Sequence, residues 1–349
     1  MRRALPPGAL LLLLLAGPAG AASHSLPATR ETTQWGWLDP REPPKLRVDS
    51  GDTVAVETML HSLDKIRPGV TMDEIVALRK ANPGGGPHSV TGPIYVRGAA
   101  PGDVLEIRIL KIDPKPDAFN FNLPGKEFPT IGVLAREFPE GFARFFRLDL
   151  EHRRAEFKPG IVLDLQPFPG IVAVGIDPSD PSPRKGGSVD PKAPVSTLRP
   201  WKNGANLDVN ELREGSTIFI PVFLDGGLVW VGDAHCRQGN GEVNLTALEC
   251  AYRQIVLQLI VRKDMTLKWP RIETPSHWIL IGVDEDLNRA MENAVREAVD
   301  FLASQTRVPL SRAEAYSLAS MVADCRVSQV VDIRKGVHCM IPKSIFVAP

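Results

Sequence analysis

This chain of 349 residues has few cysteines and few aromatic side chains, and neither sign of charge is in excess. The four cysteines contain no C-x-x-C pair, which excludes a zinc knuckle held by thiolates. Basic and acidic residues number 41 each, so the basic excess of a duplex-binding protein is missing and nucleic acid is not an expected partner. The 32 prolines indicate many loops and turns, while recurring apolar runs argue against disorder.

Long hydrophobic runs are also missing after the first 22 residues. "MRRALPPGALLLLLLAGPAGAA" has two arginines, a short leucine run and a small-residue end, which is typical of a Sec signal peptide cleaved after Ala21 or Ala22. The leucine run is too short to span a bilayer as a helix, and no cysteine follows it as a lipoprotein anchor would require. We therefore expect 1–22 to be removed and 23–349 to be periplasmic or secreted, without a membrane anchor.

Alternating apolar patterns dominate the chain as far as about residue 283. Three of them follow a turn of similar type, at 50–52 (Ser-Gly-Asp), 101–103 (Pro-Gly-Asp) and 214–216 (Glu-Gly-Ser). Alternation over short runs bounded by such turns predicts strands. This part of the chain therefore reads as mainly β, in a β-sandwich-like domain.

Helical patterns appear once early and then from about residue 284. Thr71 followed by Glu74, and Ser311 followed by Glu314, have the spacing of capping boxes, so each predicts the start of a helix. Between 284 and 306 an amphipathic helix is predicted, with one apolar face made of Leu287, Met291, Ala294, Val295, Ala298 and Leu302. A hairpin that turns near 334–336 follows, so we expect an appended C-terminal α+β part.

The segment "GDAHCRQGNGE" concentrates groups that could carry chemistry. Asp233 and His235 are two residues apart, so on a strand they share a face and could bind one divalent metal, or the Asp could orient the His. Gln238 and Glu242 follow on a glycine-rich loop whose backbone can approach a ligand closely. The spacing alone favours the alternative interpretation, an ordinary turn and a surface histidine.

A second cluster, "NGANLDVNEL", repeats the spacing with Asn206 and Asp208 just before a strand. An Asx turn is the alternative interpretation. His88 follows three glycines, where it could reach a pocket or lie in an exposed turn, and composition favours the turn. His61 has no partner nearby in the sequence, so we expect it in the core or on the surface.

The last hairpin carries Asp324, Gln329 and His338, which cross-strand pairing could bring together. Cys236 stands directly beside His235. Adjacent strand residues face opposite ways, so these two are not expected to form a catalytic pair.

Four segments, taken in order, resemble the acetamidase/formamidase family. They are "TGPIYVRGAAPGDVLEIRIL", "NGANLDVNELREGSTIFIPV", "GDAHCRQGNGEVNLTALE" and "DCRVSQVVDIRKGVHCMIPK". The likeness runs over nearly the whole mature chain and implies a β-rich fold with an α+β portion. It also implies hydrolysis of short aliphatic amides to ammonia and a carboxylic acid, with a divalent metal, zinc or calcium, as cofactor.

Residue by residue, the resemblance assigns Asp233, His235 and His88 to the metal and Glu242 to general-base work. Asn206 and Gln238 become candidate donors to the developing oxyanion. Further candidate pocket residues are Asp208, Glu249 and His338.

This chain departs from the family's motifs at Asn240, where Asp is usual, at Ala205, where Gly is usual, and at Gln166, where a His is common. If a replaced residue is a ligand, metal affinity or substrate choice differs here. The glycines around the motif suggest a small pocket for formamide- or acetamide-sized substrates. A non-catalytic exported protein that binds small ligands or metal is the alternative, and a homo-oligomer stays open.

Cys236 and Cys339 each follow a candidate site histidine at a position where the family more often has Ala. If the two histidines converge on one pocket, these cysteines could meet behind it in a disulfide. A Cys325–Cys339 bridge across the last hairpin and four free thiols are the alternatives.

Overall fold

Two nine-stranded sheets form most of the protein in a computed structural model that describes residues 21–305 and 308–347. The predicted signal peptide lies outside the described residues, apart from its last two positions. Sheet I has the strand order β1-β5-β18-β7-β15-β19-β20-β22-β21. Its strands are β1 (Ser23–Leu26), β5 (Thr53–Val56), β18 (Tyr252–Arg262), β7 (Val104–Pro114), β15 (Thr217–Pro221), β19 (Arg271–Glu273), β20 (His277–Asp284), β22 (Lys335–Pro342) and β21 (Asp324–Gln329).

Sheet II follows the path β14-β12-β16-β17-β8-β9, and β6 joins β2 and β4 to its strand β16. Its strands are β14 (Gly204–Asn206), β12 (Phe168–Ala173), β16 (Val229–Arg237), β17 (Leu248–Cys250), β8 (Asp117–Asn122), β9 (Phe142–Arg147), β6 (Ser89–Val96), β2 (Thr33–Trp35) and β4 (Leu46–Val48). Two small sheets pair β10 (Arg154–Lys158) with β11 (Ile161–Asp164) and β13 (Val195–Ser196) with β3 (Trp37–Leu38). Three short 3₁₀ helices are η1 (Ala135–Glu137), η2 (Lys185–Gly187) and η3 (Lys343–Ile345).

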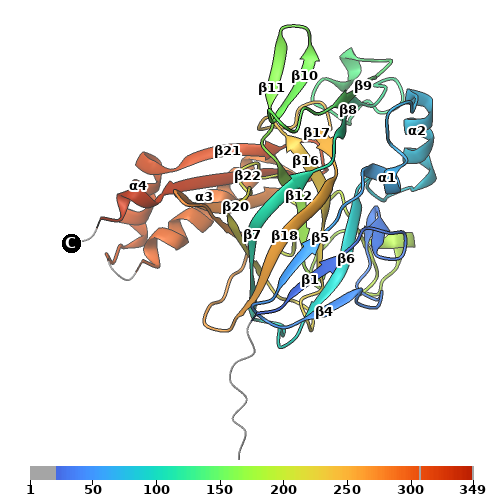
Figure 1. Cartoon of the computed structure of the whole chain (residues 1–349). Helices are drawn as coiled ribbons and strands as arrows, with labels where there is room; N and C mark the ends of the chain where they lie inside the picture. Colours follow the sequence, from blue (N-terminus) through green and yellow to red (C-terminus); the bar gives the residue numbers. More distant parts are fainter. Residues whose placement is uncertain (1–20, 306–307, 348–349) are drawn as a thin grey trace, which may run out of the picture.

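One hydrophobic core fills the space between the two sheets. Ile107 and Leu257 of sheet I share it with Val172 and Val231 of sheet II, and all four are at most 1% exposed. In Figure 1 the long strands β7 and β18 run side by side, with β16, β17 and β8 above them. The prediction of a mainly β, sandwich-like fold is confirmed.

The three predicted turns lead directly into strands of sheet I. Gly51, Gly102 and Gly215 stand in them at φ of 100°, 96° and 85°. Only glycine adopts this backbone conformation without strain. The strands that follow these turns are β5, β7 and β15. They lie near one another in sheet I, since β15 pairs with β7 and only β18 stands between β7 and β5.

The C-terminal part extends sheet I. Helices α3 (Leu287–Ala303) and α4 (Arg312–Val322) contact each other and cover strands β20 and β22, with their own hydrophobic cluster between them. The hairpin β21–β22 joins the sheet through β20. The predicted α+β part is therefore confirmed, as a continuation of the same sheet.

Both predicted capping boxes are present, at Thr71 with Glu74 before α2 (Met72–Ala81) and at Ser311 with Glu314 before α4. The predicted apolar face of α3 is only partly buried. Ala294, Ala298 and Leu302 are 0% exposed, whereas Leu287 and Met291 are 38% and 36% exposed. The buried face of α3 begins at Ala290 in the first turn, to one side of Leu287 and Met291.

Two disulfides are formed, Cys236–Cys250 between β16 and β17 and Cys325–Cys339 between β21 and β22. The predicted Cys236–Cys339 bridge is wrong, because those cysteines lie on different sheets. The alternative Cys325–Cys339 pairing is confirmed, since these residues face each other across the hairpin. Four free thiols are excluded, because all four cysteines are bonded.

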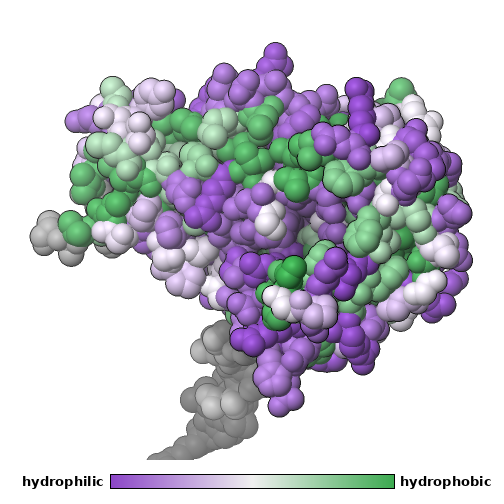
Figure 2. All heavy atoms as spheres, turned by 90° about the horizontal axis from the view of Figure 1, so that it is seen from above, coloured by the Kyte–Doolittle hydropathy of each residue, from purple (hydrophilic) through white to green (hydrophobic). Residues whose placement is uncertain are grey.

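Hydrophilic residues cover much of the face seen from above, and hydrophobic ones gather in patches among them (Figure 2). Exposed hydrophobic side chains in the structure include Ile161 and Val162 of β11 and Met321 of α4. Within residues 21–305 and 308–347, no helix has the length and apolarity needed to cross a membrane.

Candidate active site

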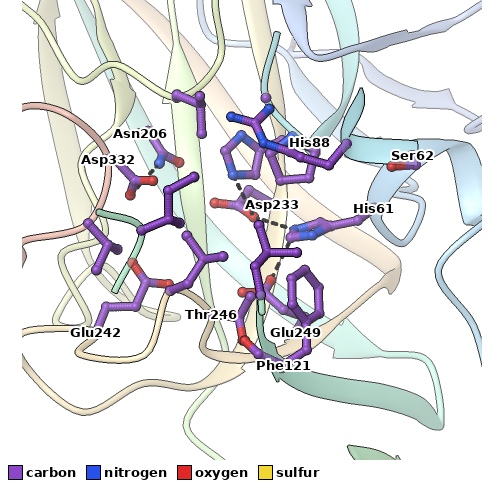
Figure 3. Close-up of a pocket in the computed structure, with 18 of the residues that line it drawn as sticks. His61, Ser62, His88, Phe121, Asn206, Asp233, Glu242, Thr246, Glu249 and Asp332 are labelled. Atoms are coloured by element: carbon purple, nitrogen blue, oxygen red, sulfur yellow. Dashed lines mark hydrogen bonds and ion pairs between the residues drawn. The ribbon is translucent and has the colours of Figure 1, made fainter. Parts of the chain in front are cut away.

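A cavity of about 410 Å³ is lined by a group of buried histidines and carboxylates, two of them on neighbouring strands inside sheet II. Strand β16 supplies Asp233 and β17 supplies Glu249, while His88 immediately precedes β6. His61 comes from the single turn α1 (His61–Asp64). Figure 3 shows His61, His88 and Glu249 directed toward Asp233 at the centre of the group.

The backbone around this group is bent into conformations that most residues avoid. Asp233 has a φ of 52° inside β16, and Ser62 and Leu63 have φ of 56° and 57° in the turn after His61. Left-handed conformations cost about 1–2 kcal/mol for a residue other than glycine. Such strain is typical of functional sites, where the surrounding structure holds a side chain in one place.

Asp233 connects the three histidines. Its Oδ1 lies 3.0 Å from His61 Nε2 and 3.8 Å from His88 Nε2, and its Oδ2 lies 3.4 Å from His235 Nε2. Glu249 Oε2 is 3.2 Å from His61 Nε2 and 3.3 Å from His235 Nε2. Two carboxylates thus stand between three imidazoles, all of them at most 5% exposed.

A second group of carboxylates adjoins the first. Asp208, Glu242 and Asp332 can place one oxygen each within 4.8 Å of one another, and Asp208 Oδ1 lies 3.8 Å from His235 Nδ1. Asn206 Nδ2 donates a hydrogen bond of 2.9 Å to Asp332 Oδ2. Three buried acids this close cannot all be ionised without a cation nearby.

The pKa shifts follow from this crowding. Burial raises the pKa of Asp332 to about 8, and the charge of Asp233 adds to the effect. Burial, helped by neighbouring carboxylates, also raises the pKa of Asp208 and Glu242 well above their ordinary values. Without a cation Asp332 therefore holds its proton at neutral pH, and the protonated form of Asp208 and Glu242 is favoured relative to a free carboxyl group.

Among the histidines and the carboxylates next to them, the pKa shifts of His61 and Glu249 favour the charged forms. Burial opposes the charge of His61, but Glu249 and Asp233 outweigh it and raise its pKa to about 9. Burial would likewise raise the pKa of Glu249, yet His235 and His61 lower it to about 2. His88, whose charged form burial disfavours most, has a pKa lowered to about 4 and is a neutral imidazole.

Several ligating atoms in the site have no hydrogen-bond partner among the residues that the structure describes. They are both carboxylate oxygens of Asp208, both ring nitrogens of His235, Nδ1 of His61 and Oε2 of Glu249. Buried polar atoms normally have hydrogen-bond partners, so atoms without one indicate a place for a ligand or ion. Gly170 adds room, because a Cβ there would lie 2.5 Å from oxygens of Asp208 and Asp233. The residues present therefore fit a divalent cation.

Seven of the nine candidate residues named from the sequence come together here. They are His88, Asn206, Asp208, Asp233, His235, Glu242 and Glu249. The spacing argument for Asp233 and His235 holds, since both side chains reach the same group from β16. Cys236, the residue after His235, turns into the core and bonds to Cys250, so the expectation that it is not paired with His235 is met.

Gln238 and His338 are placed elsewhere. Gln238 Nε2 donates to the carbonyl oxygens of Asp208 and Ser328, so it fixes the loop that carries Asp208. His338 Nε2 lies 3.1 Å from Glu211 Oε2, away from the cavity. The expected convergence in the last hairpin is therefore wrong, because His338 pairs opposite Arg326, while Gln329 hydrogen-bonds within its own loop.

His61 and Asp332 belong to the site and were not predicted to do so. His61 was expected in the core or on the surface, but its partner Asp233 is 172 residues away in the chain, where no local pattern can show it. Asp332 lies within the recognisable segment "DCRVSQVVDIRKG", which was the one available signal for it.

The three departures from the family motifs do not remove a ligand from the groups described. Asn240 is exposed and accepts from Asn210, and Gln166 is half-buried with its backbone paired to Cys236. Ala205 has a φ of 63°, so its position favours glycine for conformational reasons. The expected small pocket is wrong as well, because the cavity reaches far beyond the glycine-rich loop.

The chain belongs to the acetamidase/formamidase family, whose sequence profile matches residues 25–186 and 189–348. It is 26% identical over 200 residues to an acetamidase of Mycolicibacterium smegmatis, covering 45% of this chain and 49%, or about half, of that protein. It is 27% identical over 318 residues to a formamidase of Methylophilus methylotrophus, covering 74% and 77%. The crystal structure of an acetamidase from Bacillus halodurans superposes with a TM-score of 0.78 at 29% identity, covering 92% of this chain and 98% of that one.

Proposed function

We propose that the protein is an exported amidase that hydrolyses the C–N bond of amides to ammonia and a carboxylate with the help of a divalent metal. Hydrolysis of amide C–N bonds is the chemistry of the family to which the chain belongs. The observation that carries the proposal is the buried group of three histidines and several carboxylates, with unpartnered ligating atoms, on a cavity.

Asp233, His235 and His88 are the metal ligands we propose, joined by His61 and Glu249. Imidazole nitrogens mixed with carboxylate oxygens suit zinc, whereas calcium prefers oxygen ligands alone. When bound, a divalent cation polarises a carbonyl and lowers the pKa of a nearby water toward neutrality. The protein's part is to hold these ligands in one buried geometry, which the strained backbone at Asp233 supports.

Glu242 is the residue we propose to move protons. Its carboxyl lines the cavity beside Asp332. A divalent cation held nearby would favour its ionised form, which could take a proton from water and deliver it to the departing amine. Asn206 also lines the cavity, and one N–H of its amide is engaged by Asp332, which leaves the other for a developing oxyanion. Gln238 supports the Asp208 loop, so we do not assign it to the oxyanion.

Export rests on the N-terminal signal sequence, and the two disulfides support it. Structural disulfides persist in oxidising compartments and are rare in the cytosol. We therefore propose a periplasmic or secreted location. Sequencing of the N-terminus of protein from the periplasmic fraction should give Ala22 or Ser23, and an intact N-terminal Met in that fraction would contradict processing.

The test of function is ammonia release from a panel of amides, before and after treatment with a chelator and after readdition of zinc. Asp233→Asn and His235→Ala should lose bound metal and activity together. His152→Ala is the matched control, because His152 is exposed and pairs only with Asp149. Metal content equal to wild type in both site variants would refute the ligand assignment. Amide binding without ammonia release would favour the non-catalytic alternative.

A further inference from the structure

The size and lining of the cavity carry information about the substrate beyond its amide group. At about 410 Å³ it falls in the range of roughly 300–1,000 Å³ typical of pockets for drug-sized ligands. Formamide and acetamide occupy only a small part of such a space. The rest of the cavity therefore needs another explanation.

One wall of the cavity is the face of a hydrophobic cluster. Ile75 and Leu78 of α2, Leu123 after β8 and Ile131 line the cavity and belong to that cluster. Ile75 and Leu123 are each only 2% exposed. This wall can make few hydrogen bonds to water, and an apolar group that covers it would gain the free energy of hydrophobic burial.

The loop between β21 and β22 supplies further apolar lining. Val330 and Val331 come from it, next to the acid Asp332. The loop thus brings an apolar surface and a site carboxylate into the same cavity. A substrate whose amide lies among the carboxylates would have its substituent close to these side chains.

The two cations that line the cavity are held in place by backbone carbonyl oxygens. Arg79 donates to the carbonyl oxygen of Gly85, and Lys335 donates to the carbonyl oxygens of Glu285 and Ile333. Both are therefore engaged by the protein's own backbone. A neutral, apolar substituent fits this lining better than a carboxylate.

From these contacts we infer that the substrate is an amide carrying a neutral apolar substituent several carbons long, which covers the α2 wall. This inference rests on the proposed amidase function and deepens it. The substituent could be the acyl chain or a group on the nitrogen, because both extend from the same amide. The shared chemistry is an apolar chain next to a hydrolysable C–N bond.

The experiment compares kcat/KM for acetamide, butanamide and hexanamide, with N-butylacetamide and adipamate (the hexanamide analogue ending in a carboxylate) as further arms. Each buried methylene is worth about 0.8 kcal/mol, or about fourfold, so hexanamide should exceed acetamide by on the order of 100-fold. A gain only for N-butylacetamide places the chain on the nitrogen and still supports the inference. Adipamate should be poorer than hexanamide.

A pair of variants on α2 locates the effect. Leu78→Trp fills the cavity and should lower kcat/KM for hexanamide by about tenfold or more while changing acetamide little. Ala77→Trp is the matched control, because Ala77 is the exposed neighbour on the same helix and does not line the cavity. It should leave both substrates unchanged.

The outcomes separate the two proposals. If acetamide is hydrolysed at least as efficiently as every longer amide, the inference fails and the amidase function stands. Equal loss on both substrates in Leu78→Trp, or no loss on either, would also overturn the inference. If no primary amide releases ammonia and N-butylacetamide releases no butylamine, the proposed function fails and the inference fails with it.

Discussion

Sheet I and sheet II differ in the partners that they provide for a buried carboxylate. Glu106 of sheet I is 4% exposed, and its two oxygens lie 2.6 Å from Arg108 and 2.7 Å from Arg262. Asp208, next to sheet II, is 1% exposed, and neither of its oxygens has a hydrogen-bond partner within the described part of the chain. Sheet I therefore neutralises its buried acid with the protein's own cations, whereas sheet II leaves its acid available to a ligand.

The backbone shows the same division. Among the described strands of sheet I no residue other than glycine has a positive φ, while in sheet II Ala205 of β14 and Asp233 of β16 do. Glu242 and Leu245, in the loop between β16 and β17, have positive φ as well. Strain is thus concentrated where the candidate site lies, and sheet I with its core supplies the stability that tolerates it.

The largest effect is expected at Glu242. Glu242→Gln should lower turnover by roughly 100-fold or more, the scale of a lost general base or acid, while the thermal midpoint stays close to wild type. Steady-state ammonia release and a thermal melt measure both. Glu140→Gln is the control, since Glu140 is exposed and pairs only with Lys126. Unchanged turnover in Glu242→Gln would remove the assigned role.

A cavity in the core of sheet I should have the reverse effect. Leu257 of β18 is 0% exposed, so Leu257→Ala should lower the free energy of unfolding by about 2–5 kcal/mol. Turnover per folded molecule should not change. Urea unfolding and active-site-normalised rates provide the two readouts, and a large loss of turnover in the folded variant would contradict the division of roles between the sheets.

The two disulfides close loops of the same sequence separation, 14 residues, so replacing either pair by alanines should cost about 3 kcal/mol through loop-closure entropy. Their effects on activity should differ. Cys236–Cys250 joins β16 to β17, which carry Asp233 and Glu249, so its loss should lower turnover. Loss of Cys325–Cys339 should not. Equal turnover in both double variants, measured on folded protein, would show that the first bridge does not hold the site.

Ala205 offers a smaller test of strain. Ala205→Gly removes the left-handed penalty of about 1–2 kcal/mol and adds chain entropy to the unfolded state, so a net stabilisation of about 0.5–1 kcal/mol is expected. Ala173→Gly on the neighbouring strand β12 should destabilise instead, because its backbone is ordinary. Chemical unfolding of both variants decides; a destabilised Ala205→Gly would mean that its methyl group contributes more by packing.

The smallest effect is the pH dependence of the stability that Asp52 contributes. Asp52 stands in the turn before β5 of sheet I. Burial alone would raise its pKa, but hydrogen bonds from the backbone of Asp49 and Ala22 and from His24 lower it below 3.8. A lowered carboxyl pKa stabilises the fold above the unfolded value, and this contribution is lost as pH falls through the folded value. The difference in thermal midpoint between wild type and Asp52→Asn should therefore shrink on acidification. A difference that grows would reverse the assigned sign.

Local features of the fold were predictable because their causes are local. A capping box places its two residues three apart, and a glycine turn is complete within a few residues, so Thr71 and Gly102 could be read directly. The Cys325–Cys339 bridge could be named as an option, since a hairpin sets its own register. The Cys236–Cys250 bridge was not predicted. The loop between β16 and β17 is irregular, so the sequence does not give the register in which these strands pair.

The site was predictable only in part for the same reason. Asp233 and His235 were found by their spacing on one strand. His61 and Asp332 reach the site from distant segments, and only the folded sheet brings them to Asp233. His338 was predicted to line the pocket because it lies in a recognisable motif. In the structure it pairs with Glu211, a contact that no local sequence pattern indicates.

Strand β18 lies between β5 and β7, so the centre of sheet I forms only after β18 has been synthesised. β5 ends at residue 56 and β18 begins at residue 252, so the centre of sheet I cannot close until most of the chain is available. Contacts of such long sequence separation make folding slow, because loop closure must come before the contacts that reward it. A nascent chain of this topology therefore stays unfolded for longer, which is compatible with the export that we propose.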